Sequence, residues 1–174
     1  DRLARGGNDR AVPLPTTRLT HADRNAPELK GDLDFSFSGL KTAVLRYVNS
    51  KKGSGVLFEG TRKPDSRPLL TESEVADVCA SFQRVVVAAL VDRTFDAARR
   101  HQARSIGVAG GVSANSGLRD EVKAHGEARE IPTFVPSLQL STDNAAMIAA
   151  AGLRMFRAGI TASMDVNADA SLPL

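Results

Sequence analysis

The sequence predicts an α/β fold, because segments typical of buried strands alternate with segments typical of amphipathic helices over residues 105–157. Residues 105–109 and 131–136 are short and apolar, as buried strands are. Each precedes a run whose apolar side chains recur every three or four residues, which is the helical spacing. Between the first strand and its helix lies the glycine pair Gly110-Gly111, around which the rest of the chain is organised.

The first residues, 1–30, are predicted to form an irregular connection. A short helix over 1–4 is ended by the glycines at positions 6 and 7. The prolines that follow fix φ and disfavour helix, so the chain is extended or turning there. A loop of this length is uncommon inside a compact domain and usually carries a function.

The next segment is predicted to form one strand and one helix. Residues 33–37 alternate apolar and polar side chains, as a half-buried strand does. Residues 40–50 then carry an apolar stripe with helical spacing, and either Ser36 or Ser38 can cap this helix. Lys41 lies off the stripe, where it is either an exposed lysine or a contact for phosphate.

Residues 51–70 are predicted to be a basic linker, since glycines and prolines interrupt them throughout. Between Lys41 and Arg67 the chain has seven basic residues and two acidic ones. Such an excess can contact the phosphates of a nucleic acid, although a solvated surface is the commoner explanation.

The longest helix is predicted over residues 71–100. Thr71 and Glu74 have the spacing of a capping box, and the apolar stripe behind them is wide. Cys79 lies on the apolar face of this helix. As the only cysteine, it is typical of a buried thiol in the reducing cytoplasm.

Two further helices are predicted near the end of the chain. The first runs from 115 to 125 and is ended by Gly126. The second covers 145–157 and is capped from within residues 141–144. Residues 160–174 are predicted to be an extended tail.

The composition indicates one soluble domain. The chain has 174 residues, of which 42% are hydrophobic and 25% are charged. No apolar run reaches the roughly 18 residues of a membrane span, and no signal peptide opens the chain. Because the first residue is Asp1 and a helix is already in progress there, we expect the chain to be part of a longer cytoplasmic protein.

The strand, glycine turn and helix start at residues 105–118 predict a phosphate or nucleotide site. Glycine lets the backbone approach a ligand closely, and a helix N-terminus offers N–H groups and partial positive charge to an anion. The alternative is a tight connection in which Ser113 or Asn115 is only the N-cap of the helix. The glycine patterns of dinucleotide-binding and P-loop proteins are both absent.

Three segments carry a family resemblance: Asp34-Phe35-Ser36-Phe37-Ser38-Gly39-Leu40-Lys41-Thr42-Ala43, Gly110-Gly111-Val112-Ser113-Ala114-Asn115 and Ser141-Thr142-Asp143-Asn144-Ala145-Ala146-Met147-Ile148. In order and spacing they resemble the C-terminal half of the tRNA threonylcarbamoyladenosine transferases, the TsaD family, long labelled glycoproteases or sialoglycoproteases. The opening Asp1-Arg2-Leu3-Ala4 is similar to the end of that family's Gly-Gly-Pro-x-Ile-Asp-Arg-Leu-Ala segment. No Ser–His–Asp or Cys–His pair in the sequence supports the protease label.

The resemblance implies an ASKHA fold, the duplicated architecture of actin-like ATPases and sugar kinases, in which two lobes enclose a nucleotide. Residues 1–174 are similar to the C-terminal lobe only, with a mixed sheet and flanking helices. The implied acyltransferase reaction moves threonylcarbamoyl from threonylcarbamoyl-AMP to N6 of the tRNA adenosine 3′ of the anticodon. The implied partners are tRNA and, in bacteria, an ASKHA paralogue and a small ATPase, with no membrane.

The resemblance also implies roles for single residues. Asn115, after the glycine pair Gly110-Gly111, contacts the adenylate, and Asp1 lies in the nucleotide site. Asp143 binds one divalent metal, iron or zinc, together with two histidines of an HxxxH motif. That motif is absent here, because the three histidines lack its spacing and are expected on the surface: His21, His101 and His125. Without the resemblance, Asp143 is more simply an N-cap.

Two other functions are compatible with an ASKHA lobe: a non-catalytic scaffold that binds partners, and a small-molecule kinase. Asn115 and Asp143 favour the transferase over the scaffold. The isolated chain is expected to be inactive, because one carboxylate does not make a metal site. Its bare apolar inter-lobe face is expected to favour self-association.

Overall fold

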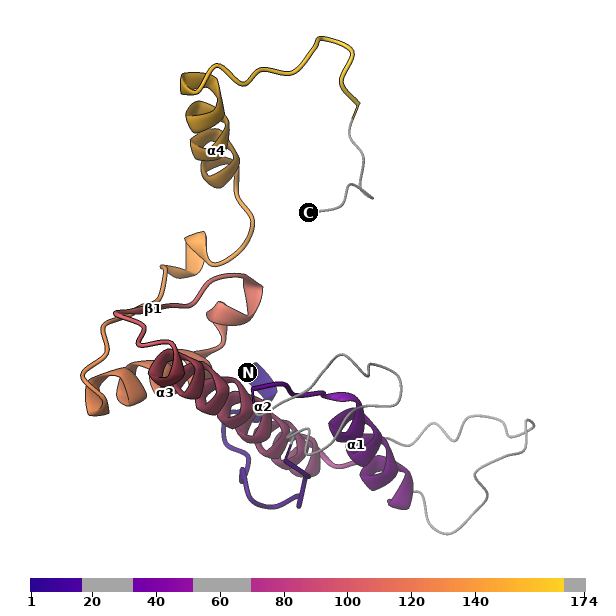
Figure 1. Ribbon diagram of the computed structural model, residues 1–174. Coiled ribbons are helices and arrows are strands. Elements are labelled where there is room, and N and C mark those ends of the chain that lie inside the picture. The colour runs from indigo at the N-terminus through magenta and orange to yellow at the C-terminus, as the bar shows by residue number, and fades with distance from the viewer. Residues whose placement is uncertain (17–32, 52–69, 168–174) are drawn as a thin grey trace.

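The computed structural model describes residues 1–16, 33–51 and 70–167. Its central element is the long helix α2 (Glu72–Arg100), with the N-terminal turn and two shorter helices along it (Figure 1). Strands β1 (Ile106–Gly107) and β2 (Thr133–Phe134) pair in parallel, with Ile106 opposite Thr133. Helices and a parallel sheet together confirm the predicted α/β class.

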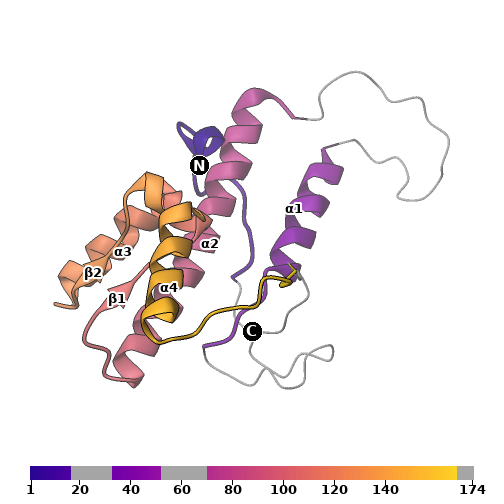
Figure 2. The ribbon, with the colours of Figure 1, turned by 90° about the horizontal axis from the view of Figure 1, so that it is seen from above.

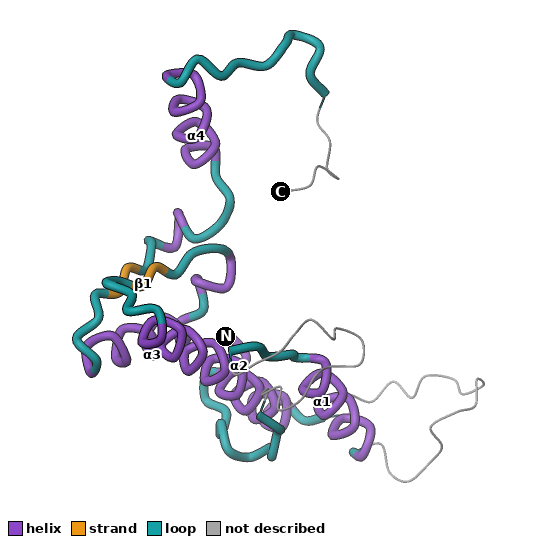
Figure 3. Tube along the Cα trace, in the orientation of Figure 1, coloured by secondary structure: helices purple, strands orange, loops and turns teal. Residues whose placement is uncertain are grey.

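The sheet is smaller than the sequence predicts. In the described residues it has two parallel strands, whereas a mixed sheet with a strand over 33–37 is expected. That segment is a loop in which only Phe35 forms an isolated bridge (Figure 3). Its alternating aromatic residues pack on each other instead, since the Phe35 and Phe37 rings lie edge to face at 5.2 Å. A strand also needs a neighbour for its backbone groups, and β1 and β2 lie elsewhere (Figure 2).

Helix α2 begins as predicted. Thr71 Oγ1 accepts a hydrogen bond from Glu74 N (3.2 Å), and Glu74 Oε2 accepts one from Thr71 N (2.9 Å), which completes the capping box. The second half of α2 packs against β1 and α3 (Ser116–Ala128) to form the core. The buried members of this core are Val87, Val91, Phe95, Ala98, Ile106, Leu118 and Val122.

The N-terminal segment lies against α2. The 3-10 turn η1 (Arg2–Ala4) matches the predicted short helix. After it, Asn8 N donates a hydrogen bond to Asp77 Oδ1 (2.7 Å), and Val12 N donates one to Ser81 Oγ (3.2 Å). These bonds attach the first part of the irregular connection to the first half of α2.

Helix α1 (Ser38–Ser50) confirms the predicted helix. Its N-cap is Phe37, so neither Ser36 nor Ser38 takes the predicted capping position. Ser36 Oγ nevertheless accepts a hydrogen bond from Ser38 N (3.3 Å), and Lys41 is exposed. Residues 17–30 of the predicted irregular connection and 52–69 of the predicted basic linker lie outside the described residues.

Helix α3 does not end at Gly126, which corrects the prediction. It continues to Ala128, and Gly126 is buried where α3 crosses β2. A Cβ at this position would overlap Thr133 Cγ2, so close packing rather than helix termination requires the glycine. The carbonyl of Gly126 accepts a hydrogen bond from Ile131 N (3.0 Å), which directs the chain into β2.

Helix α4 (Ala145–Arg157) confirms the last predicted helix and stands away from α2 and α3 (Figure 1). None of its residues is buried, and Ile148 and Phe156 are 75% and 70% exposed. Gly159 follows the helix with a φ of +74°, which suits a C-terminal cap. No helix in the described part of the chain is long and apolar enough to cross a membrane.

Candidate functional site

The backbone of the turn after β1 is held in one conformation by a glycine and a hydrogen bond. Gly110 has a φ of +83°, a conformation that favours glycine. The 3-10 turn η2 (Gly111–Ala114) follows it, and the fully buried Ser113 donates from Oγ to Gly110 O (2.6 Å). A Cβ on Gly110 or Gly111 would meet no atom within 4 Å. The backbone of the glycine pair therefore faces open space.

Asn115 is the N-cap of α3. Its Oδ1 accepts a hydrogen bond from Leu118 N (3.0 Å), and its Nδ2 donates one to Gln83 Oε1 (3.0 Å). The capping role expected for Ser113 or Asn115 is thus confirmed for Asn115. This role does not exclude ligand contact, because an amide NH₂ group has two N–H donors and one is used here.

Asp1 joins this group from the other end of the sequence. Ser116 Oγ donates to Asp1 Oδ1 (2.7 Å), and Ser116 N lies 3.4 Å from Asp1 Oδ2. Arg5 Nη2 lies 3.8 Å from the same carboxylate. Three predicted site features therefore converge at the start of α3: the Asp1 carboxylate, the Asn115 amide and the exposed glycine pair.

A small, mainly apolar cavity of about 190 Å³ adjoins two of these features, Asp1 and Asn115. Asp1, Gln83 and Asn115 line it together with apolar side chains of α2, η2 and α3. The half-buried Cys79 is one of them, so the thiol predicted to be buried faces this cavity. A pocket with an apolar wall and a few convergent polar groups is typical of a small-ligand site.

Three residues that support this candidate site were not predicted from the sequence: Gln83, Ser116 and Arg119. The guanidinium of Arg119 donates to Ser113 O (2.8 Å) and to Pro136 O (2.6 Å), and so ties the glycine turn to the segment after β2. Ser116 was detectable as a small polar residue next to the N-cap. Gln83 and Arg119 belong to no recognisable sequence motif. They come close to the glycine turn and the start of α3 only when the chain is folded.

Asp143 lies outside this group. It is exposed at the start of α4, and the helix is capped by Asn144, whose Oδ1 accepts a hydrogen bond from Met147 N (3.1 Å). The N-cap alternative for Asp143 is therefore wrong. In the described ranges, no three His, Cys, Asp or Glu side chains come close enough together to hold a metal ion.

The histidines differ from one another. His101 is exposed, as expected, and His21 lies outside the described residues. His125 is only partly at the surface: its side chain is 28% exposed, its ring packs on Phe95 at 5.6 Å, and its Nδ1 is buried without a hydrogen-bond partner. Its Nε2 lies 3.6 Å from Glu121 Oε2 on the same helix.

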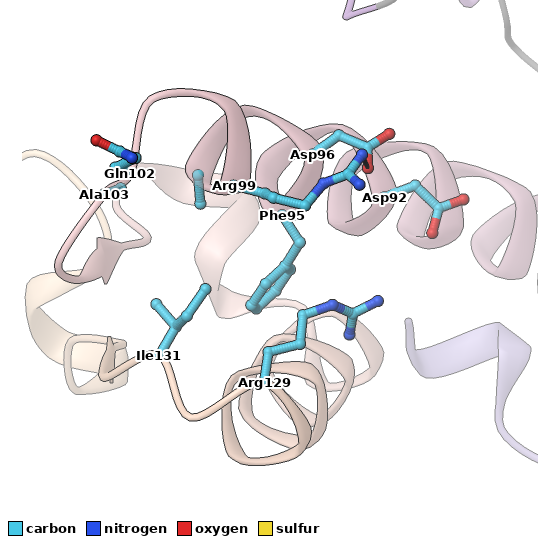
Figure 4. Close-up of a pocket in the computed structure, with 9 residues that line it drawn as sticks. Asp92, Phe95, Asp96, Arg99, Gln102, Ala103, Arg129 and Ile131 are labelled. Atoms are coloured by element: carbon cyan, nitrogen blue, oxygen red, sulfur yellow. Dashed lines mark hydrogen bonds and ion pairs between the residues drawn. The ribbon is translucent and has the colours of Figure 1, made fainter.

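A larger cavity of about 650 Å³ lies at the C-terminal ends of α2 and α3 (Figure 4). Its lining has carboxylates from Asp92 and Asp96 and guanidinium groups from Arg99 and Arg129. Arg129 stacks over the buried Phe95 ring at 5.1 Å. No predicted site residue lies in this cavity, so its size does not make it the candidate site.

Comparison with known proteins gives one consistent result. The family model of TsaD, tRNA N6-adenosine threonylcarbamoyltransferase, matches residues 1–150. Proteins of that name from Koribacter versatilis, Symbiobacterium thermophilum and Moorella thermoacetica are 40%, 43% and 41% identical over 100% of this chain. The chain covers 49%, 43% and 44% of their lengths, and so spans less than half of these curated relatives.

Proposed function

The chain belongs to the TsaD family of tRNA N6-adenosine threonylcarbamoyltransferases, and from this premise we propose that it is the C-terminal, nucleotide-binding lobe of such an enzyme. The full-length enzyme has the two-lobed ASKHA architecture. It transfers threonylcarbamoyl from threonylcarbamoyl-AMP to N6 of the tRNA adenosine 3′ of the anticodon. This lobe holds the adenylate part of the donor at Asp1, the glycine pair and Asn115.

The convergence of Asp1 and Asn115 is the observation that supports this proposal most directly. The Asp1 carboxylate reaches the first turn of α3, where Ser116 Oγ donates to it at 2.7 Å. Asn115, the N-cap of that helix, is separated from Asp1 by more than a hundred residues of sequence. The exposed Gly110-Gly111 backbone belongs to the turn that leads into the same helix.

The chemistry of these groups suggests which part of the adenylate each one takes. A carboxylate repels phosphate but accepts hydrogen bonds from hydroxyl groups, so Asp1 suits the ribose. The open glycine turn and the helix N-terminus suit the phosphate. The apolar cavity of about 190 Å³, walled by Phe82 and Val86 among others, suits a flat base.

Asn115→Ala in the full-length enzyme tests this site. We expect adenylate binding to weaken by about 1–2 kcal/mol, the scale of one buried hydrogen bond. Isothermal titration calorimetry with AMP in metal-free buffer measures the change. The matched control is Asn144→Ala, which removes an equivalent N-cap from α4 and should leave AMP affinity unaltered. Equal affinity of wild type and Asn115→Ala would remove Asn115 from the site.

We also propose that Asp143 supplies one oxygen ligand to a divalent metal, iron or zinc, whose other ligands are histidines outside this chain. Its carboxylate is exposed and is not used as the N-cap. The described residues do not form a metal centre by themselves. Asp143→Ala should lower the metal content of the full-length enzyme, measured by mass spectrometry; an unchanged content would contradict this role.

The enzyme is proposed to act in the cytoplasm with tRNA as its substrate and, in bacteria, with an ASKHA paralogue and a small ATPase as partners. The net charge of +3 and the pI near 9.4 favour contact with RNA phosphates. Pull-down of the tagged full-length enzyme from its own cells should recover both protein partners, and their absence would contradict this part of the proposal.

A further inference from the structure

The side chain of Gln83 on α2 reaches across to the start of α3. Gln83 Oε1 accepts the hydrogen bond from Asn115 Nδ2 at 3.0 Å in a partly buried position. Asn115 Oδ1 accepts its own bond from Leu118 N at 3.0 Å. Both ends of the Asn115 amide therefore have a partner, and together these partners fix which end is oxygen and which is nitrogen.

The first turn of α3 leaves room for Gln83 because residue 117 is glycine. A Cβ on Gly117 would lie 2.8 Å from Gln83 Nε2 and 3.4 Å from Asn115 Oδ1. Alanine is the more favourable residue within a helix. At position 117, however, alanine would displace the Gln83 amide. Gln83 of α2 and Gly117 of α3 therefore support the same orientation of Asn115.

We propose that Gln83 is a positioning residue for the transfer reaction and acts through Asn115. One N–H of Asn115 Nδ2 is bonded to Gln83, which directs the second N–H of the same group toward the adjoining cavity and the bound adenylate. Without the Gln83 acceptor, the bond from Leu118 N still holds Asn115 Oδ1, but the N–H groups of Nδ2 are less firmly oriented and present the donor for only part of the time. The inference rests on the proposed function, because it takes Asn115 as an adenylate contact.

A double-mutant cycle in the full-length enzyme tests the inference. Gln83→Met keeps the length of the side chain and removes the acceptor. We expect the Kd for AMP, measured by calorimetry, to rise about tenfold, equivalent to about 1.4 kcal/mol. In an Asn115→Ala background, the same substitution should cause no further rise, because the two residues act as one unit. Gln139→Met, at an exposed glutamine of η3 (Leu138–Leu140), is the matched control and should leave the Kd unaltered.

Gly117→Ala provides a second route to the same disturbance with Gln83 intact. Gly117→Ala should raise the Kd for AMP to a similar extent. The KM for tRNA should stay constant, since only the adenylate site is affected. If Gln83→Met fails to fold, as judged by circular dichroism, Gly117→Ala alone and combined with Asn115→Ala completes the cycle.

The outcomes separate the two proposals. If Asn115→Ala leaves AMP affinity unchanged, the proposed nucleotide site is wrong, and the role of Gln83 falls with it. If Asn115→Ala weakens binding and Gln83→Met and Gly117→Ala do not, only the positioning role is wrong. Additive losses in the double mutant also overturn that role, because Gln83 would then act independently of Asn115.

Discussion

The absence of a side chain at Gly126 allows α3 to pack closely against β2. The residue is buried in α3, and its Cα faces β2. An added Cβ would overlap Thr133 Cγ2 and lie 2.9 Å from Ile131 O, and the backbone carbonyl has little freedom to move away. Glycine is therefore retained inside a helix where alanine has the better intrinsic propensity.

Gly126→Ala should destabilise the folded state by about 1–3 kcal/mol, the usual effect of overpacking a core. Urea unfolding followed by circular dichroism measures the change. The matched control is Gly152→Ala in α4, where a Cβ meets nothing within 4 Å and alanine should be neutral or stabilise by up to about 1 kcal/mol. Equal stabilities of wild type and Gly126→Ala would show that α3 and β2 are not in this close contact.

The role of a single residue was predictable where it depends only on its neighbours in the sequence. Asn115 was identified as a possible N-cap because it stands between a glycine turn and an apolar stripe, and the structure confirms that capping role. Gln83 was not predictable, because its bond to Asn115 spans 32 residues and depends on how α2 packs on α3. The ligand roles of Asp1 and Asp143 came from the family resemblance and remain proposals.

At the scale of elements, the start of α2 is stabilised by a charged pair. Lys51 Nζ, just after α1, lies 2.9 Å from Glu74 Oε1. The hydrogen bond from Lys51 and those from Thr71 lower the pKa of Glu74 from 4.5 to about 2. The same pair raises the pKa of Lys51. The contact therefore links the end of α1 to the first turn of α2.

The stability of the chain should depend on pH through Glu74. Because its pKa is lower in the folded chain than in the unfolded chain, ionised Glu74 stabilises the folded state above about pH 4.5, and this stabilisation is lost as the pH falls toward 2. Glu74→Gln keeps a side chain that can form a capping box but removes the charge. The Tm of wild type should exceed that of the variant at pH 6, and the two values should converge near pH 2.

Thermal melts between pH 2 and pH 6, followed by circular dichroism, measure this convergence. Glu72→Gln is the matched control, since it removes the neighbouring carboxylate and leaves the Lys51–Glu74 contact intact. It should retain the pH dependence of the wild type. A difference in Tm between wild type and Glu74→Gln that is the same at every pH would contradict a lowered pKa for Glu74.

The helices were predictable as elements, and the sheet was predictable only in part. The capping box at Thr71 and the apolar stripes of α1 and α4 are signals carried by neighbouring residues, so the sequence shows them directly. Strand pairing is a contact between distant segments. The alternation over 33–37 therefore predicted a strand where the structure has a loop, because no described neighbour pairs with it beyond the bridge at Phe35.

At the scale of the whole molecule, the C-terminal quarter differs from the rest. Many large apolar side chains between residues 134 and 166 are at least half exposed, whereas the core lies between α2 and α3. The exposed large apolar side chains of α4 are Met147, Ile148, Leu153, Met155 and Phe156. Exposed apolar surface of this extent is typical of an interaction site. Self-association of the isolated chain stays a prediction, which light scattering tests: a monomer at all concentrations would contradict it.

The α/β class followed from the alternation of strands and helices, because each element is signalled locally. The two-lobed architecture came from the family resemblance and stays a proposal, since the described residues form one small sheet and its helices. The reaction is proposed from family membership, because the chain covers less than half the length of the curated relatives it matches. The activity is therefore a property to be measured on the full-length enzyme.

The most direct test of the central claim is a transfer assay with tRNA, threonylcarbamoyl-AMP and a divalent metal. Mass spectrometry of the digested tRNA detects N6-threonylcarbamoyladenosine. The full-length enzyme should form this nucleoside, Asn115→Ala should form it about five- to thirtyfold more slowly, as a loss of 1–2 kcal/mol requires, and the isolated 174-residue chain should form none. Absence of product with the full-length wild type, or product made by the isolated chain alone, would contradict the account.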